Sequence, residues 1–157
     1  MSSSCRPSLF CPRYTDWGWK NFQAWIHAGF NNQLITPDGR VHRLITRLAT
    51  ERLFHPFQPF FIGQKNVAPK LALQMDIPLI FYGENEAEYG NTKKSFEAAR
   101  KDHNYWSPHD TSDIYLGGTS VRELEEDFGV DRSELQLYIP LNPEPLVEKD
   151  VQVHYLG

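Results

Sequence analysis

The stretch that most constrains the fold of this chain is residues 77–90, with the sequence IPLIFYGENEAEYG. Residues 77–82 form a short apolar run rich in branched and aromatic side chains, and Gly83 ends it. Such a run predicts a strand buried on both faces, in which Pro78 is tolerated only near the start. Ligands of open α/β sheets bind beyond the carboxyl ends of the strands. The three acids that follow this strand therefore mark the best candidate site in the sequence: Glu84, Glu86 and Glu88.

The acids allow more than one chemistry. Carboxylates two residues apart point to the same side of an extended backbone, whereas in a helix Glu84 and Glu88 would pair as i, i+4 neighbours. Either arrangement gathers negative charge that a cation must offset. In a site that uses ATP the natural cation is Mg²⁺, which takes one or two protein carboxylates together with phosphate oxygens. A general base acting on ammonia and an exposed acidic loop are the alternatives.

The composition bounds the class of protein. A chain of 157 residues has the size of one ordinary domain, and its 13% of aromatic residues argues against disorder. The formal charge of -4 and the lack of a basic block argue against nucleic acid or an anionic membrane as a partner. No apolar run approaches the roughly 20 residues of a spanning helix, so membrane insertion is not expected. With two cysteines, Cys5 and Cys11, a reducing cytoplasm fits best.

Residues 15–36 predict a helix followed by a strand. A capping residue at Thr15 and a stop at Gly29 bound the helix. Residues 30–36 predict the strand, and residues 37–39 (PDG) predict a tight turn. Aromatic and apolar residues at helical spacing predict a stripe that faces the core, in preference to a surface that stacks on a ligand: Trp19, Phe22, Gln23 and Ile26.

The clearest helix pattern covers residues 41–54. Arg40, Arg43 and Arg47 fall on one face of this helix. A solvated face is the default interpretation of such a stripe, and the alternative is a surface that binds a nucleotide phosphate or a sugar carboxylate. The apolar positions of the helix also recur at helical spacing: Val41, Leu44, Ile45, Leu48 and Leu53.

Residues 55–76 predict a loop and then a second helix. Residues 55–60 (HPFQPF) contain two prolines and predict a packed corner that no helix crosses. A helix is predicted over residues 68–75, with Pro69 in its first turn, where the missing N–H does no harm. The free backbone donors of this helix N-terminus would let the residues in front of it meet an anion: Gln64, Lys65 and Asn66.

The rest of the chain alternates irregular and regular segments. Residues 91–118 are polar and aperiodic, which favours a solvated or functional loop over a metal site at His103, His109, Asp110 and Asp113. Ser120 and Glu123 predict a capping box that starts a helix, and Gly129 ends it. One further turn is predicted over residues 131–137, and a final strand alternates through three residues: Val151, Val153 and Tyr155.

Three stretches of the sequence, TDWGWKNFQ, GRVHRLITRLATERLFHPFQPF and GENEAEYG, occur in the order found in one known family. They resemble the N-acetyl sugar amidotransferases, PP-loop ATP pyrophosphatases of bacterial surface-polysaccharide synthesis, from about Tyr14 onward. The resemblance implies an α/β fold like that of the adenine nucleotide alpha hydrolases, here a partial parallel sheet with flanking helices. The family's SGGKDS loop is missing. We therefore expect residues 1–13 to be an irregular, non-family start and residues 14–157 a partial domain truncated at both ends.

The resemblance also implies a reaction. ATP adenylates the oxygen of a sugar acetamido group with loss of pyrophosphate, and ammonia from a glutaminase subunit then displaces AMP. The product is an acetamidino sugar for lipopolysaccharide or O-antigen synthesis. ATP and Mg²⁺ are the implied cofactors, and a nucleotide-linked acetamido sugar is the implied substrate. Without the phosphate-binding loop the chain alone is expected to be inactive, as a split subunit that needs a fragment carrying that loop or as the product of a broken gene.

Residue roles follow from this resemblance. Glu84 and Glu88 are expected to be catalytic and to hold Mg²⁺. Substrate contacts are expected from Asn85, Glu86 and Tyr89, with weaker contributions to phosphate or sugar binding from Arg43, Arg47 and Lys65. Two other classes of function stay open: an interaction module that kept the fold without ATP turnover, and an unrelated metal-dependent hydrolase that uses the acids with His103 or His109.

Overall fold

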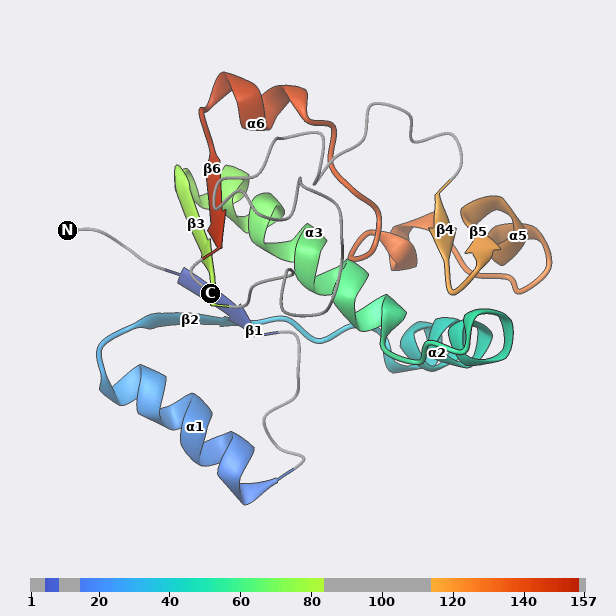
Figure 1. Cartoon of the computed structure of the whole chain (residues 1–157), viewed down its shortest axis with the longest axis horizontal. Helices are drawn as coiled ribbons and strands as arrows, with labels where there is room; N and C mark the ends of the chain where they lie inside the picture. Colours follow the sequence, from blue (N-terminus) through green and yellow to red (C-terminus); the bar gives the residue numbers. More distant parts are fainter. Residues whose placement is uncertain (1–4, 9–14, 84–113, 156–157) are drawn as a thin grey trace. The chain divides into compact units, whose positions relative to one another are not determined.

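A computed structural model describes residues 5–8, 15–83 and 114–155 of the chain (Figure 1). The chain divides into two units, residues 1–67 with 112–139 and residues 68–111 with 140–157. In the part that the structure describes, each unit combines helices with one pair of parallel strands. The predicted mixed α/β class is therefore confirmed, and its assignment to the PP-loop fold stays a prediction.

The first unit begins with a strand, a helix and a second strand. β1 (Cys5–Ser8) pairs in parallel with β2 (Asn31–Leu34), although residues 1–13 show no periodicity in the sequence. α1 (Asp16–His27) separates the two strands along the chain. The hydroxyl of Thr15 accepts a hydrogen bond from the N–H of Gly18 at 3.0 Å, and Gly29 has a φ of +85°. The predicted cap and stop of this helix are confirmed.

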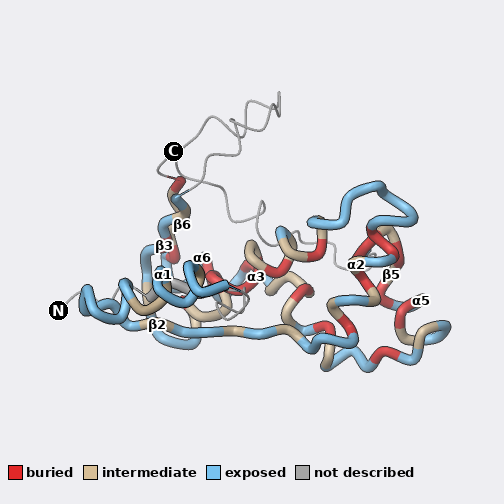
Figure 2. The backbone as a smooth tube through the Cα atoms, turned by 90° about the horizontal axis from the view of Figure 1, so that it is seen from below, coloured by how far each residue is buried: buried red, intermediate tan, exposed pale blue. Residues whose placement is uncertain are grey.

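No side chain of α1 is buried, and Trp17 is 73% exposed. Figure 2 accordingly shows no buried segment along this helix. The predicted core-facing stripe is wrong, because Trp19 is 41% and Ile26 48% exposed, while Phe22 and Gln23 are only half-buried. The aromatic side chains pack on one another instead. Trp19 stacks on Phe22 with 5.8 Å between ring centroids, and Trp25 meets Phe30 edge-on at 5.2 Å.

α2 (Gly39–Leu53) supplies one side of the core of the first unit. Asp38 caps it, since its carboxylate accepts hydrogen bonds from the N–H groups of Arg40 and Val41 at 2.8 and 3.0 Å. The tight turn predicted at residues 37–39 is thus replaced by a helix cap, a role that aspartate fills equally well. Ile45 and Leu48 are buried as predicted. They and Val41 pack against buried residues from later in the chain: Leu116, Val121, Leu124, Val130, Leu135 and Tyr138.

α3 (Gln58–Met75) is one helix of 18 residues, where the sequence predicts a loop and a shorter helix. Residues 68–75 are helical as predicted, but the helix begins at Gln58, so the predicted helix start and the loop predicted to reach residue 60 are wrong. Both errors come from the treatment of proline. Pro59 stands in the first turn, where no N–H is needed, and Pro69 stands inside the helix. Pro69 has no N–H to donate to the carbonyl of Lys65, which costs about 3 kcal/mol in a helix interior. Burial of the adjoining apolar side chains offsets this cost: Val67, Ala68 and Ala72.

A tight hairpin follows in the first unit. β4 (Tyr115–Leu116) pairs with β5 (Thr119–Ser120), and the two glycines between them have φ values of +63° and +72°. α5 (Val121–Glu126) starts at Ser120, whose hydroxyl accepts the N–H of Glu123 at 3.1 Å. Of the two hydrogen bonds of the predicted capping box, the one to the Ser120 hydroxyl is confirmed. The carboxylate of Glu123 does not return to Ser120, because it pairs with Arg52. The turn predicted near residue 131 is a 3₁₀-helix, η4 (Arg132–Leu135), with a complete capping box at Asp131.

The second unit is built on two parallel strands and the helices that lead into them. α3 leads into β3 (Leu79–Tyr82), and α6 (Glu144–Glu148) leads into β6 (Gln152–Tyr155). Burial on both faces of β3 is a wrong prediction, since Leu79 is 42% and Phe81 50% exposed. Within residues 5–8, 15–83 and 114–155, one face of the pair packs into a core. That core joins side chains of all four elements: Ala68, Ala72, Ile80, Leu146, Val151, Val153 and Tyr155.

The hairpin glycine Gly117 fixes the packing of the first unit. A Cβ added there would lie 2.5 Å from the carbonyl oxygen of Ile45 and 2.9 Å from the nitrogen of Ala49, at a φ of +63°. We predict that Gly117→Ala lowers the free energy of unfolding by about 3 kcal/mol or more, because left-handed strain adds to a backbone clash. Urea unfolding measures this loss.

Gly129→Ala is the matched control. Its φ is +62°, yet no atom of the described residues lies within 4 Å of the added Cβ, so we expect a loss of only about 1 kcal/mol from strain. Equal losses for the two variants would show that Gly117 does not pack against α2 as described.

Candidate functional site

The parallel pair of β3 and β6 places two carboxyl ends at one edge. The strands run in register from Leu79 opposite Gln152 to Tyr82 opposite Tyr155, so they end together. Gly83 follows β3 directly, and the acids come next in the sequence. The residues predicted for this site lie outside the described residues: Glu84, Asn85, Glu86, Glu88 and Tyr89.

Two tyrosines stack at this edge. The rings of Tyr82 and Tyr155 lie 5.1 Å apart between centroids with 15° between their planes. Burial raises the pKa of the Tyr82 phenol, which therefore stays neutral at physiological pH. On the neighbouring residues, Phe81 and His154 contact each other with 5.7 Å between ring centroids. The Tyr82–Tyr155 pair packs on the core face, and the Phe81–His154 pair lies on the opposite face of the strands. The sequence does not predict these pairs, because strands that are far apart along the chain leave no local signal of their pairing.

The arginine stripe of α2 interacts with acids of the chain itself. A guanidinium nitrogen of Arg40 lies 2.6 Å from a carboxylate oxygen of Glu134, and Arg47 lies 3.8 Å from Glu51. The hydrogen bond from the N–H of Val41 lowers the pKa of the Asp38 carboxyl, and the N–H of Arg40 and the charges of Arg40 and Arg43 lower it further. The stripe is therefore a solvated face with ion pairs, which agrees with the default interpretation. Anion binding by Arg43 and Arg47 stays a prediction.

Lys65 does not stand before a helix N-terminus. It lies in the interior of α3 and is half-buried, as is Gln64, while Asn66 is buried. The side-chain amide of Asn66 donates a hydrogen bond of 2.6 Å to the carbonyl of Tyr138. The predicted anion site at free backbone donors is thus wrong at residues 64–66, because the backbone N–H groups of this stretch belong to a continuing helix. A role of the Lys65 ammonium in substrate binding stays a prediction.

His42 and Tyr138 form a polar pair inside the first unit. Nδ1 of the half-buried His42 lies 2.7 Å from the hydroxyl of Tyr138, and the rings stack. When Nδ1 carries no proton, the tyrosine hydroxyl donates to it. Desolvation lowers the pKa of His42, and it raises that of Tyr138, so both groups are neutral near pH 7. Tyr138 also belongs to the buried core of the first unit, so the pair joins α2 to that core.

No set of three histidine, cysteine, aspartate or glutamate side chains within residues 5–8, 15–83 and 114–155 could hold a metal ion. The predicted magnesium ligands, Glu84 and Glu88, lie outside these ranges, as do His103 and His109 of the alternative hydrolase site. No described helix is long and apolar enough to cross a membrane. Comparison of the sequence with models of known protein families and with curated proteins found no match.

The His42–Tyr138 pair makes stability depend on pH. Because the folded pKa of His42 lies below its ordinary value of 6.5, the unfolded chain binds a proton that the folded chain excludes. Stability is therefore complete above about pH 6.5 and falls as the pH drops below it, by at most about 1.4 kcal/mol per pH unit. Urea unfolding from about pH 7 to about pH 5 should show this fall.

His42→Gln is the control, since glutamine keeps a polar partner for Tyr138 and does not titrate. The loss of stability over the same range should shrink in the variant. Parallel curves for both proteins would mean that His42 ionises equally well in the folded and unfolded states.

Proposed function

We propose that this chain takes part in the ATP-dependent conversion of a sugar acetamido group to an acetamidino group, with ammonia as the nitrogen donor. The observation that carries the proposal is the parallel pairing of β3 with β6, because it puts a run of acids directly after the carboxyl end of a parallel strand. Ligands of open α/β sheets bind at that end. The resemblance of three ordered stretches to the N-acetyl sugar amidotransferases supplies the reaction.

The chemistry is a change of leaving group. The amide oxygen of the acetamido group attacks the α-phosphorus of ATP, and pyrophosphate leaves. Ammonia then adds to the activated carbon and AMP leaves, while a base takes the surplus proton. An amide oxygen leaves poorly, and as part of AMP it leaves well, so catalysis rests on positioning and on neutralising charge.

The residue roles in the proposal fit this chemistry. Glu84 and Glu88 offer carboxylate oxygens, the ligand type that Mg²⁺ prefers, and a bound Mg²⁺ would offset the negative charge of the phosphates. Asn85, Glu86 and Tyr89 offer hydrogen bonds to sugar hydroxyl groups. Arg43, Arg47 and Lys65 are further contacts to phosphate or to an acidic sugar.

A second candidate is an interaction module that kept the fold without turning over ATP. The observation that favours it is the sequence itself, which contains no SGGKDS stretch among its 157 residues. A glycine-rich loop supplies the backbone N–H groups that cradle phosphates in many nucleotide sites. The two candidates differ in whether the activity of the protein requires the carboxylates of Glu84 and Glu88.

The test is a reconstitution. The purified chain is mixed with a separately produced polypeptide that carries the SGGKDS loop, and release of AMP and pyrophosphate is measured with a nucleotide-linked acetamido sugar and ammonia. We predict turnover in the mixture and a loss of about 10²–10⁴-fold in kcat/KM for Glu84→Gln or Glu88→Gln, the range for losing one catalytic group.

Glu126→Gln is the control, because Glu126 is exposed on α5 and has no assigned role. It should leave turnover unchanged. Turnover that survives in both site variants would refute the assigned roles. A chain that binds the loop-bearing polypeptide but yields no turnover in any mixture would favour the interaction module.

A further inference from the structure

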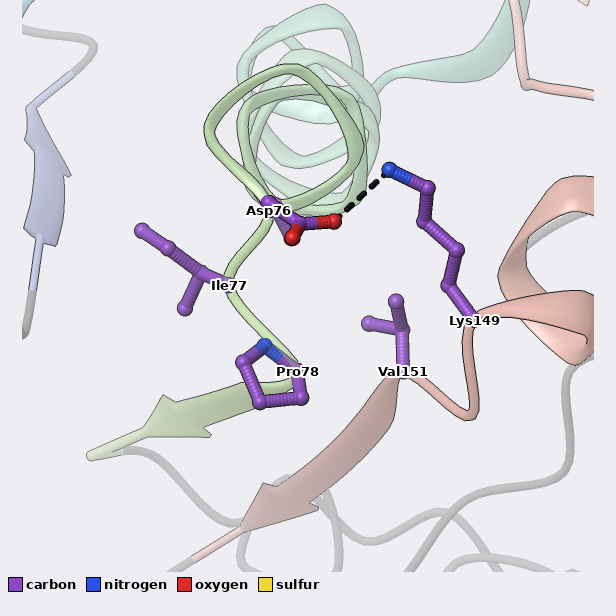
Figure 3. Close-up of a pocket in the computed structure, with 6 residues that line it drawn as sticks. Asp76, Ile77, Pro78, Lys149 and Val151 are labelled. Atoms are coloured by element: carbon purple, nitrogen blue, oxygen red, sulfur yellow. Dashed lines mark hydrogen bonds and ion pairs between the residues drawn. The ribbon is translucent and has the colours of Figure 1, made fainter.

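A small pocket lies at the amino ends of β3 and β6, the edge opposite to the one that leads into the acids. It has a volume of about 260 Å³ and is lined by Ala72, Asp76, Ile77, Pro78, Lys149 and Val151 (Figure 3). This is slightly smaller than the roughly 300–1,000 Å³ of pockets that hold drug-sized ligands, so an occupant would be small. All six residues belong to the second unit.

The backbone around this pocket is fixed by two matching helix ends. α3 ends at Met75 and is followed by Asp76 with a positive φ of 56°. α6 ends at Glu148 and is followed, after Lys149, by Asp150 with a positive φ of 45°. The N–H of Ile77 donates to the carbonyl of Ala72 at 2.8 Å. The N–H of Val151 donates in the same way to Leu146 at 2.9 Å. These are bonds of the Schellman motif, and they fix the backbone that lines the pocket.

One ion pair marks the polar side of the pocket. The ammonium of Lys149 lies 2.8 Å from a carboxylate oxygen of Asp76, and this pairing lowers the pKa of the carboxyl. The two side chains are 48% and 83% exposed, so the pair contributes little to folding stability. Both charges remain accessible to a ligand. Figure 3 shows Pro78 and Val151 across the pocket from the pair, and both present apolar atoms.

We propose that this pocket binds a small zwitterion with an aliphatic side chain, an α-amino acid of the size of valine or leucine. The ligand carboxylate pairs with Lys149, its ammonium pairs with Asp76, and its side chain contacts Pro78 and Val151. This arrangement places four alternating charges side by side, so the protein ion pair need not be separated. The negative ends of the α3 and α6 helix dipoles further favour the ligand ammonium.

Ligands with a single charge fit this pocket less well. A carboxylate without an ammonium would pair with Lys149 and face the charge of Asp76. An amine without a carboxylate would face Lys149 in the same way. Glycine would satisfy both charges and leave the apolar wall uncovered. The inference does not rest on the proposed amidotransferase function, because none of its residues is shared with the acid-bearing edge.

The test is a titration followed by two-dimensional amide NMR on the full chain. L-Leucine should shift the amide signals of Ile77 and Val151 with saturation at millimolar concentration. Glycine, 4-methylpentanoate and 3-methylbutylamine remove the side chain, the ammonium and the carboxylate in turn, and each should bind about tenfold or more weakly. Absence of saturable shifts with L-leucine, or equal affinity for the singly charged analogues, would overturn the proposal.

Two variants, each lacking one charge of the ion pair, should favour a singly charged analogue over L-leucine. Asp76→Asn suits a left-handed position and should weaken L-leucine by about tenfold while strengthening 4-methylpentanoate, because the repelling carboxylate is gone. Lys149→Met should weaken L-leucine equally and strengthen 3-methylbutylamine. Glu125→Gln alters another exposed ion pair, with Arg132 at 3.9 Å, and should leave every affinity unchanged. Variants that bind all four compounds like the original chain would refute the assigned contacts.

Discussion

The parallel pairing of β3 with β6 is the constraint on which the second unit depends. It joins two four-residue strands from distant parts of the chain, and the N–H of Gln152 adds a hydrogen bond of 2.8 Å to the carbonyl of Pro78 just before β3. Parallel strands need a crossover connection, because the chain must enter both strands at the same edge of the pair. α3 and α6 meet this need by ending in the same left-handed turn, after which Ile77 and Val151 enter the core.

The first unit depends on a close approach of backbones. The hairpin at Gly117 and Gly118 rests on α2, where a side chain at Gly117 would overlap the carbonyl of Ile45. The side chain of Gln58 accepts the N–H of Gly117 at 3.0 Å, which ties the same turn to the start of α3. This contact brings Leu116 into the core, and the short strands β4 and β5 owe their stability to that packing rather than to their own hydrogen bonds.

Signals carried by one or two neighbouring residues could be predicted from the sequence. The predicted caps at Thr15 and Ser120 and the stop at Gly129 depend on groups a few residues away, and all of them form. Signals that depend on distant packing could not. Pro69 interrupts a helix in isolation, and only the buried neighbours of the folded unit hold α3 together around it. The pairing of Tyr82 with Tyr155, which builds the edge before the acids, is equally invisible to local patterns.

The direction of the helices separates the charges at the two edges of the β3–β6 pair. Both helices lead into their strands, so their carboxyl ends, which carry partial negative charge, lie at the amino edge of the pair. A phosphate bound there would be repelled by the negative helix ends and by the carboxylate of Asp76, and the single positive charge of Lys149 could not offset both repulsions. An ammonium group finds favourable charge at the same place. The amino edge therefore favours a ligand that carries a cation, whereas the acids that follow Gly83 require a cation such as Mg²⁺ to accompany any phosphate that binds near them.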